Sequence, residues 1–190
     1  MNIQSRILTA LAALLILLLF ILPLWKISLM APQYPDGLTM YLYINDIKDG
    51  SPGDIANINI MNHYVGMKDI SAEDFPEFTY FPIVVIGISL FGLLAALIGN
   101  RKILLIWVIF FSVLGIMGIY DFYLWEYDYG HTLSDTAAIK VPGMAYQPPL
   151  FGRKEILNFI AYSYPQSGGY MMGVSIMLGA VAWLISGKKK

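Results

Sequence analysis

The fold is decided by the stretch ILLIWVIFFSVLGIMGIY, which occupies Ile103–Tyr120 and contains no charged residue. Three more stretches of this kind lie at Ile7–Trp25, Tyr80–Gly99 and Tyr170–Ser186. Each has about 17 to 21 residues, enough for a helix to cross a hydrocarbon layer about 30 Å thick. The chain is 57% hydrophobic with a mean hydropathy of +0.62, which is too apolar for an ordinary soluble domain. The sequence therefore predicts an all-α membrane protein with four transmembrane helices.

The basic residues predict how these helices are oriented. Arg6, the pair Arg101 and Lys102, and the run Lys188–Lys190 all fall on one side of the membrane if the chain crosses it four times. The positive-inside bias makes that side the cytoplasm, so both termini are expected there. The two long loops, about 27–79 and 121–169, then face the periplasm of a bacterial inner membrane. They hold all 13 acidic residues and both histidines, so we expect the function to reside in them.

This pattern divides the chain into five segments. Residues 1–26 form a first helix, expected to be retained as a signal anchor because no small-x-small cleavage site follows it closely. The other segments are periplasmic loop one at 27–79, a helical hairpin at 80–122, periplasmic loop two at 123–168, and a fourth helix with a basic cytoplasmic tail at 169–190.

The long loops are predicted to fold together as a small mixed α/β cap on the helices, because their aromatic and aliphatic content does not suit disorder. The run Leu38–Ile44 follows a turn signal and is rich in β-branched and aromatic residues, which favours a strand. A short helix is expected to begin near Ile55. Residues Asp121–Tyr129 are expected to continue the third span as a helix beyond the membrane, and Glu155–Tyr162 to form a short amphipathic helix.

Several function classes are excluded by what the sequence lacks. The absence of cysteine excludes disulfides, thiolate metal sites and cysteine nucleophiles. There is no clustered Lys and Arg of the kind that binds nucleic acid. No ionisable residue lies in the middle of a predicted span, which argues against a proton relay or an ion pore. With no phosphate-binding glycine loop and no nucleophile elbow either, we do not expect an enzyme.

The segment MNHYVGM, residues 61–67, is the densest candidate for chemistry. His63 and Met67 are four residues apart, so on a helical turn they share one face, and Met61 reaches the same site if the chain bends near Gly66. Thioether and imidazole ligands together suit copper, above all Cu(I), because soft ligands select it. Asn62 and Tyr64 would orient these ligands.

The second outer loop offers matching ligands. His131, the only other histidine, lies there, and Met144 follows it in an extended Pro-Gly-Met segment. A copper site shared between the loops would thus use His63, Met67, His131 and Met144, with Met61 in reserve. Two ordinary alternatives stay open: a histidine beside an aromatic ring is more often a structural residue, and methionines in a membrane protein mostly serve packing.

Two strings carry a resemblance. NHYVGM at Asn62–Met67 and VPGMAYQPPL at Val141–Leu150 resemble segments of small four-span bacterial inner-membrane proteins associated with nitrous-oxide reductase maturation and copper-handling gene clusters. The resemblance covers most of the chain, including Ala31–Gly37 and the Gly130-His131 pair. It implies a genetic context more than a mechanism, and it implies a copper enzyme or its assembly machinery as partner.

The sequence thus predicts a periplasm-facing membrane protein that binds copper or assists the assembly of a copper enzyme. One alternative is a structural subunit without metal, whose cap docks a periplasmic or membrane partner through aromatic residues and methionine. A second alternative is a quinol-linked electron-transfer subunit.

Overall fold

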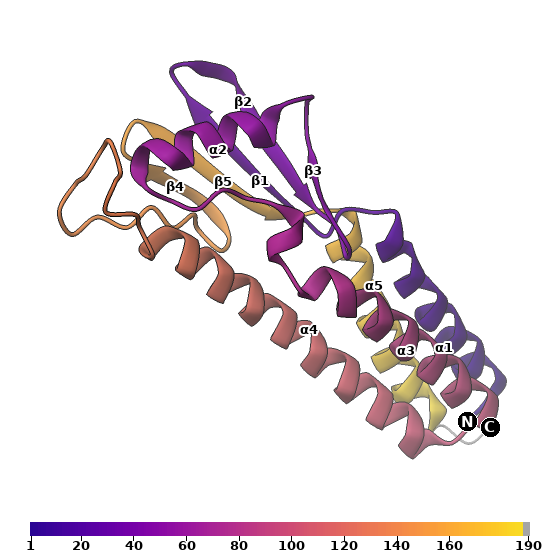
Figure 1. Cartoon of the computed structure of the whole chain (residues 1–190). Helices are drawn as coiled ribbons and strands as arrows, with labels where there is room; N and C mark the ends of the chain where they lie inside the picture. The colour runs from indigo at the N-terminus through magenta and orange to yellow at the C-terminus, as the bar shows by residue number, and fades with distance from the viewer. Residues whose placement is uncertain (188–190) are drawn as a thin grey trace.

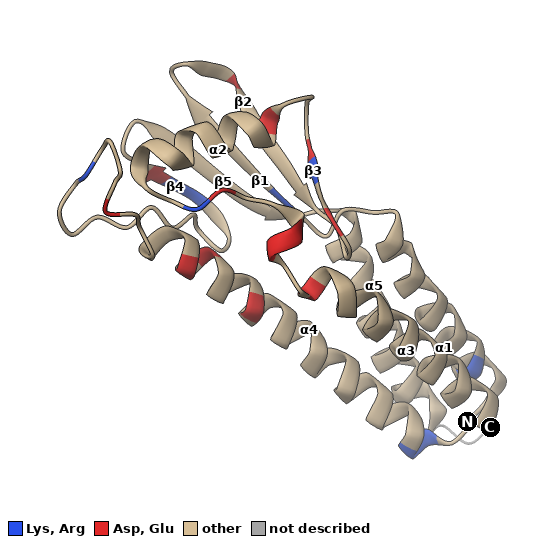
Figure 2. Cartoon of the chain, in the orientation of Figure 1, with Lys and Arg blue, Asp and Glu red and all other residues tan. Residues whose placement is uncertain are grey.

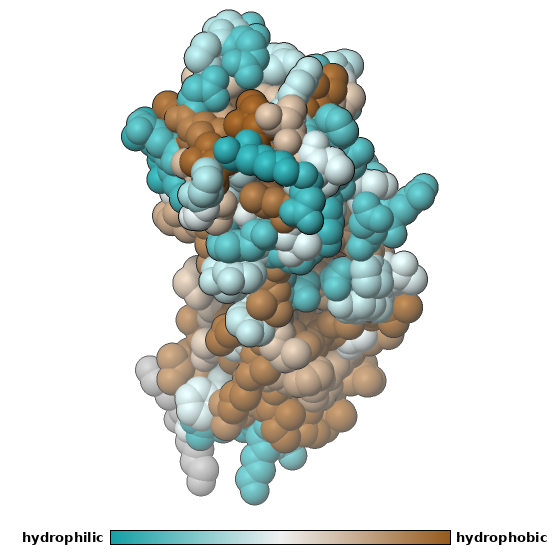
Figure 3. All heavy atoms as spheres, turned by 60° about the vertical axis from the view of Figure 1, so that its left-hand side comes forward, coloured by the Kyte–Doolittle hydropathy of each residue, from teal (hydrophilic) through white to brown (hydrophobic). Residues whose placement is uncertain are grey.

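A computed structural model describes residues 1–187 and contains a bundle of long helices with a mixed α/β cap at one end (Figure 1). The bundle consists of α1 (Ile3–Leu15), extended by the 3-10 helix η1 (Ile16–Phe20), together with α3 (Glu77–Ile98), α4 (Arg101–His131) and α5 (Ser167–Ser186). In the described residues, four helical segments are long and apolar enough to cross a membrane. On the face shown in Figure 3, the surface of the bundle is predominantly apolar and the cap carries most of the hydrophilic surface.

Small residues allow the bundle to close around one large side chain. Trp107 is fully buried, and its indole nitrogen donates a hydrogen bond of 2.9 Å to the carbonyl of Ile88. A Cβ added to Gly92 or to Gly179 would lie 2.7 or 2.6 Å from the Trp107 ring. These two glycines, on α3 and α5, therefore make the room that the indole occupies, as small residues commonly do where membrane helices pack.

Charge separates along the molecule as the sequence suggests. Arg6 near the start of α1, and Arg101 and Lys102 at the start of α4, lie at the end of the bundle away from the cap, whereas the acidic residues gather in and near the cap (Figure 2). The run Lys188–Lys190, which the predicted topology also used, lies outside the described residues.

The prediction of an all-α fold is wrong, because the two long loops build one antiparallel sheet. Its strand order is β3-β2-β1-β5-β4. Loop one supplies β1 (Trp25–Ala31), β2 (Tyr34–Leu42) and β3 (Ile47–Asp49), and loop two supplies β4 (Gly152–Ile156) and β5 (Phe159–Pro165). The loops are joined where β1 pairs with β5, with Ser28 opposite Tyr162.

The amphipathic helix expected at Glu155–Tyr162 is also wrong. These residues form the β4–β5 hairpin, with Ile156 paired to Phe159 and Leu157 in the turn at a φ of +56°. Apolar residues spaced three and four apart mimic a helical period here, but β5 is paired on both edges, with β1 and β4. Of the strand predicted at Leu38–Ile44, residues 38–42 lie in β2, and the helical continuation through Tyr129 is confirmed within α4.

The core of the cap lies on one face of this sheet. The helix α2 (Asp54–Val65) and the last turns of α4 cover that face (Figure 1), and a short 3-10 helix, η2 (Ala72–Asp74), follows α2. The sheet contributes Ile27, Leu29 and Met40 to a buried cluster that α2 completes with Ile58. At 31 residues and about 1.5 Å per residue, α4 is about 46 Å long, so its end reaches well past a layer of about 30 Å.

Candidate functional site

A narrow cavity of about 40 Å³ lies inside the cap, between the sheet, α2 and the end of α4. Its walls are mostly apolar, but three methionines line it: Met40 from β2, Met61 from α2 and Met67 just beyond α2. Glu126 of α4 lines the same cavity. The space therefore suits a small ion or a few waters and excludes a large organic cofactor.

Glu126 is the most unusual residue of the cap. Its side chain is fully buried, and neither carboxyl oxygen has a hydrogen-bond partner among the described residues. Burial disfavours the charged form and raises the pKa of Glu126 to about 8, while the positive charge of Lys154 acts in the opposite direction. The Lys154 ammonium itself donates to the carbonyl of Gln147 at 2.8 Å.

Two further polar atoms near Glu126 also lack a partner in the described part of the chain. They are the indole nitrogen of Trp125 and the hydroxyl of Tyr146, and both side chains line the cavity. Buried polar groups are usually hydrogen-bonded, so a cluster of unpartnered groups calls for an explanation such as an ion, a water or a ligand. Trp125 is fixed within an aromatic cluster, with ring centroids 5.2 Å from Phe75 and 5.0 Å from Tyr129.

The end of α2 places Met67 in the cavity wall. Gly66 has a φ of +80°, a conformation that suits glycine, and closes the helix. The amide of Met67 donates to the carbonyl of Asn62 at 2.9 Å, and that of Gly66 to His63 at 3.3 Å. Met67 therefore lies beyond the helix and turns inward, whereas His63 stays on the exposed surface of α2. The expectation that these two residues share one helical face is wrong.

Two glycines allow loop two to wrap this region closely. A Cβ on Gly130 would lie 2.3 Å from Cα of Gln147, and one on Gly66 would lie 2.8 Å from Cβ of Ala137. The carbonyl of Gly130 accepts a hydrogen bond from the amide of Tyr146 at 2.9 Å. Loop two thus crosses directly over the end of α4 and brings Tyr146 into the cavity wall.

The remaining predicted ligands lie outside this cavity wall. His131 is exposed at the end of α4 and stacks on Tyr127 with ring centroids 3.9 Å apart. The His63 ring contacts the Tyr64 ring edge to face, with ring centroids 6.5 Å apart. Among the aromatic pairs in residues 1–187, none contains both histidines. Met144 is partly buried against the same core. The predicted set is thus divided: Met61 and Met67 face the cavity, while both histidines lie on the surface.

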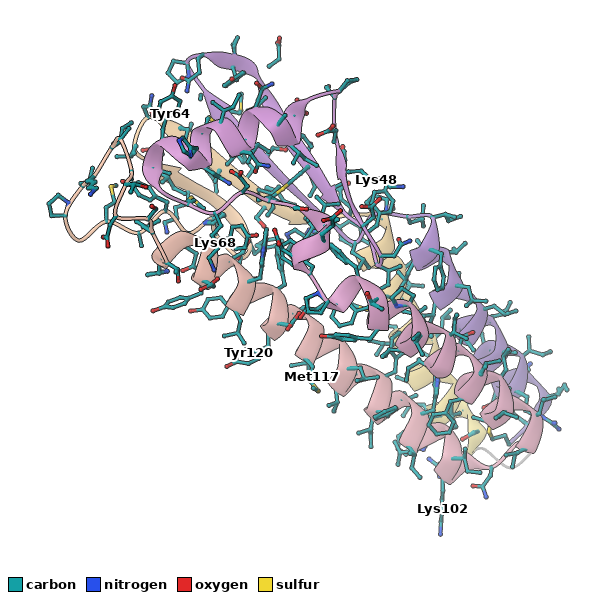
Figure 4. The ribbon with its side chains drawn as sticks, in the orientation of Figure 1. Lys48, Tyr64, Lys68, Lys102, Met117 and Tyr120 are labelled. Carbon is teal, nitrogen blue, oxygen red and sulfur yellow. The ribbon has the colours of Figure 1, made fainter. Side chains whose placement is uncertain are left out.

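The two residues expected to orient the ligands are also separated. Asn62 is buried, lines the cavity, and donates through its amide to the carbonyl of Lys68 at 3.2 Å. Tyr64 is half exposed and points outward from α2 (Figure 4). Lys68 in turn forms an ion pair of 2.7 Å with Asp128, which ties the end of α2 to α4 and lowers the pKa of Asp128.

Glu126 is the residue that our sequence reasoning missed. Its signal was present: Phe122, Glu126 and Tyr129 follow the four- and three-residue steps of one helical face, so a buried Phe122–Tyr129 face includes the carboxyl group. Residues 1–187 contain no group of three or more His, Asp or Glu side chains arranged to hold a metal ion. A metal in this cavity would therefore depend mainly on thioethers.

A second hollow, of about 290 Å³, opens on the other side of Tyr146 and Val65, which line both spaces. Its wall is formed mostly by the segment 133–142, including Leu133, Ile139 and Val141. Ile139 is 46% exposed, and its amide donates to the carbonyl of Tyr64 at 2.9 Å. The tip of the cap thus combines an open hollow with exposed apolar side chains.

Comparisons of the chain with protein-family models, with curated proteins and with solved structures give no match.

Proposed function

We propose that the protein is a membrane-anchored copper-binding protein that holds Cu(I) in its cap and assists the assembly of a copper enzyme. The observation that carries this proposal is the shared cavity of Met40, Met61 and Met67 with the unpartnered carboxyl group of Glu126. Two of these thioethers, Met61 and Met67, belong to the ligand set that the sequence predicts.

The chemistry of the cavity suits a soft monovalent ion. Thioether sulfur is a soft, neutral ligand that favours Cu(I), whereas Ca²⁺ and Mg²⁺ require oxygen ligands and Zn²⁺ prefers cysteine, histidine and carboxylate. An ion surrounded only by neutral groups in an apolar interior pays a large desolvation cost. The Glu126 carboxylate would supply the compensating negative charge, and the apolar walls would keep the site dry.

The predicted surface ligands fit the same proposal in a different role. His63 and His131 are exposed, so we propose that they contact copper during delivery or release, while the thioethers hold it. Met144, which packs against the core near these segments, is proposed as a further thioether on this route.

The resemblance to nitrous-oxide reductase maturation proteins supplies the proposed partner, a copper enzyme or its assembly machinery on the periplasmic side of a bacterial inner membrane. Deleting the gene for this chain should then lower the copper content of that enzyme without lowering the amount of its polypeptide.

The direct test is Cu(I) competition against a chromophoric chelator, using purified full-length protein under reducing conditions. We expect one tightly held Cu(I) per chain and a loss of affinity of at least about tenfold in Met67→Leu, which keeps volume and apolarity but removes sulfur. The matched control is Met30→Leu, because Met30 is 41% exposed on β1 and is not part of the cavity wall.

Equal affinity in Met67→Leu, Met30→Leu and the unmodified protein would exclude the cavity as the site. If His63→Ala and His131→Ala then abolish binding, the surface site predicted from the sequence replaces it. Failure of the unmodified protein to take up copper would reject the function.

A second candidate is the docking subunit without metal, which the open hollow beside Tyr146 and the exposed Ile139 favour. It predicts that Ile139→Asp abolishes assembly with the partner while Met67→Leu has no effect. The copper proposal instead predicts that Met67→Leu lowers the metal content while Ile139→Asp leaves it unchanged.

A further inference from the structure

In the described part of the chain, one face of the sheet carries no helix. The helix α2 and the end of α4 pack on the face that contains Ile27 and Met40 (Figure 1). The side chains that alternate with these point to the opposite face, because successive residues of a strand face opposite sides. None of the following residues of that opposite face is buried: Lys26, Ser28, Thr39, Tyr41, Tyr162 and Tyr164.

The strand register builds a row of alternating lysine and tyrosine across this face. Lys48 of β3 pairs with Tyr41 of β2, Tyr41 with Lys26 of β1, and Lys26 with Tyr164 of β5. Directly paired residues lie on the same face, so the four side chains form one band across four strands. The Lys26 ammonium lies 6.0 Å from the centroid of the Tyr41 ring, and that of Lys48 lies 4.7 Å from the Tyr43 ring.

This band lies at the base of the cap, beside the membrane helices. Lys26 is the second residue of β1, which follows η1 shortly after Phe20, and Tyr164 comes three residues before α5 begins at Ser167. Lys48 lies where the cap meets the bundle (Figure 4). Next to Tyr164 stands Phe151, which is 65% exposed and meets the Tyr164 ring edge to face at 5.2 Å.

Within residues 1–187, the two lysines of the band form no ion pair with a carboxylate. The ion pairs among the described residues are Lys68–Asp128 and Arg153–Glu155. The acidic residues next to Lys48 are occupied by backbone amides: Asp46 accepts from Ile47 at 2.8 Å, and Asp49 accepts from Ile55 at 2.7 Å. Lys26 and Lys48 therefore present two ammonium groups that form no ion pair with any carboxylate in residues 1–187.

We propose that this band, formed by Lys26, Tyr41, Lys48 and Tyr164, binds the phosphate headgroup of an anionic phospholipid in the leaflet on the cap side. The lysine ammonium groups attract the phosphate, and the tyrosines place their rings toward the acyl boundary with their hydroxyls among the headgroups, as aromatic residues do at membrane interfaces. Lys26 and Tyr164 lie within a few residues of the apolar helices η1 and α5, which favours a lipid over a soluble phosphate or a soluble protein. This inference does not depend on copper.

The test uses the full chain reconstituted in phosphatidylcholine with spin-labelled lipid as the probe. The measured quantity is the preference of the protein for spin-labelled phosphatidylglycerol over spin-labelled phosphatidylcholine. Lys26→Gln combined with Lys48→Gln should reduce this preference by at least about fivefold, the effect expected of a single lysine at an anionic surface. The matched control, Lys140→Gln, removes a lysine at the far tip of the cap and should leave the preference unchanged.

Arg6, Arg101 and Lys102 at the opposite end contribute a constant background to this preference, because they are the same in the unmodified protein and in every variant. A reduction in the double variant, with Lys140→Gln unchanged and with no competition by millimolar inorganic phosphate, supports the lipid site. An unchanged preference in the double variant would overturn the proposal. Abolition of the preference by inorganic phosphate would also overturn it, because the band would then be a site for a free anion. Lys26→Arg with Lys48→Arg, which keeps the charge, should retain the preference and shows that any loss is not a folding defect.

Discussion

The bundle and the cap differ in how fully their buried polar groups are hydrogen-bonded. In the bundle, buried hydroxyls are used to join helices: Ser5 donates to Ala182 at 2.7 Å, and Ser89 donates to Ala13 at 2.8 Å. In the cap, the described buried atoms without a partner belong to Trp125, Glu126 and Tyr146. Because an unpartnered buried polar group costs stability, the cap keeps a feature that folding alone does not favour. The bundle is thus built for packing, and the cap is where we locate the function.

The largest expected effect tests the packing of the bundle around Trp107. Trp107→Ala removes a fully buried indole and its hydrogen bond to Ile88, and Gly92 and Gly179 cannot fill the space. We expect a loss of about 3 to 5 kcal/mol in unfolding free energy, measured by titration with a denaturing detergent. Ile116→Ala, on the exposed surface of α4, should cost far less; equal losses would mean that Trp107 does not organise the bundle.

The next effect concerns the pH dependence of the cap. Burial raises the pKa of Glu126 to about 8 in the folded protein, above the ordinary value of 4.5 for a glutamate side chain. The folded protein therefore holds the Glu126 proton to a higher pH than the unfolded chain does. The stabilisation that comes from this protonated carboxyl group is fully present below about pH 4.5 and is lost as the pH rises to about 8. Each pH unit above 4.5 lowers the unfolding free energy by about 1.4 kcal/mol, so the loss at pH 7 is about 3 kcal/mol.

Glu126→Gln should remove that slope and stabilise the metal-free protein at pH 7 by a similar amount. The measurement is the unfolding free energy between pH 4.5 and pH 8, with Glu155→Gln as control because Glu155 is exposed on β4. A slope that persists in Glu126→Gln would show that another group is responsible.

The smallest expected effects come from removing one buried hydroxyl from the bundle and one from the cap. Ser89→Ala removes a bonded hydroxyl from the bundle and should cost about 0.6 kcal/mol, the average for such bonds between membrane helices. Tyr146→Phe removes an unpartnered hydroxyl from the cap and should leave stability unchanged or slightly higher. Both values come from the same detergent titration. A larger loss in Tyr146→Phe would indicate that its hydroxyl is bonded in the protein.

The helical bundle was largely predictable because its signal is local. Residues Ile103–Tyr120 are apolar without interruption, and a helix satisfies all its backbone hydrogen bonds within the segment itself. The extension of α4 through Tyr129 was predictable for a similar reason, since no proline or glycine interrupts Asp121–Tyr129.

Only part of the sheet was predicted from the sequence. The strand around Leu38 was predicted. The alternation of Ile27, Leu29 and Ala31 with polar or exposed residues also favours a strand, but no strand was predicted at β1. The hairpin at Glu155–Tyr162 was misread because its apolar spacing fits a short helix as well as a strand. The pairing of β5 with β1, which joins residues 130 to 140 positions apart, decides between the two, and no local window contains that information.

The candidate site shows the same division. Sequence alone determined that the chain carries four apolar helices with a polar cap, and that the segment 61–67 offers soft ligands, because hydropathy and ligand type are properties of single residues and short runs. Only the tertiary structure decided that Met67 turns inward after Gly66 while His63 remains outside, and that Glu126 lines the same cavity as the methionines. The physical reason is that a cavity is formed by elements distant in sequence, so its lining depends on how the sheet, α2 and α4 pack together.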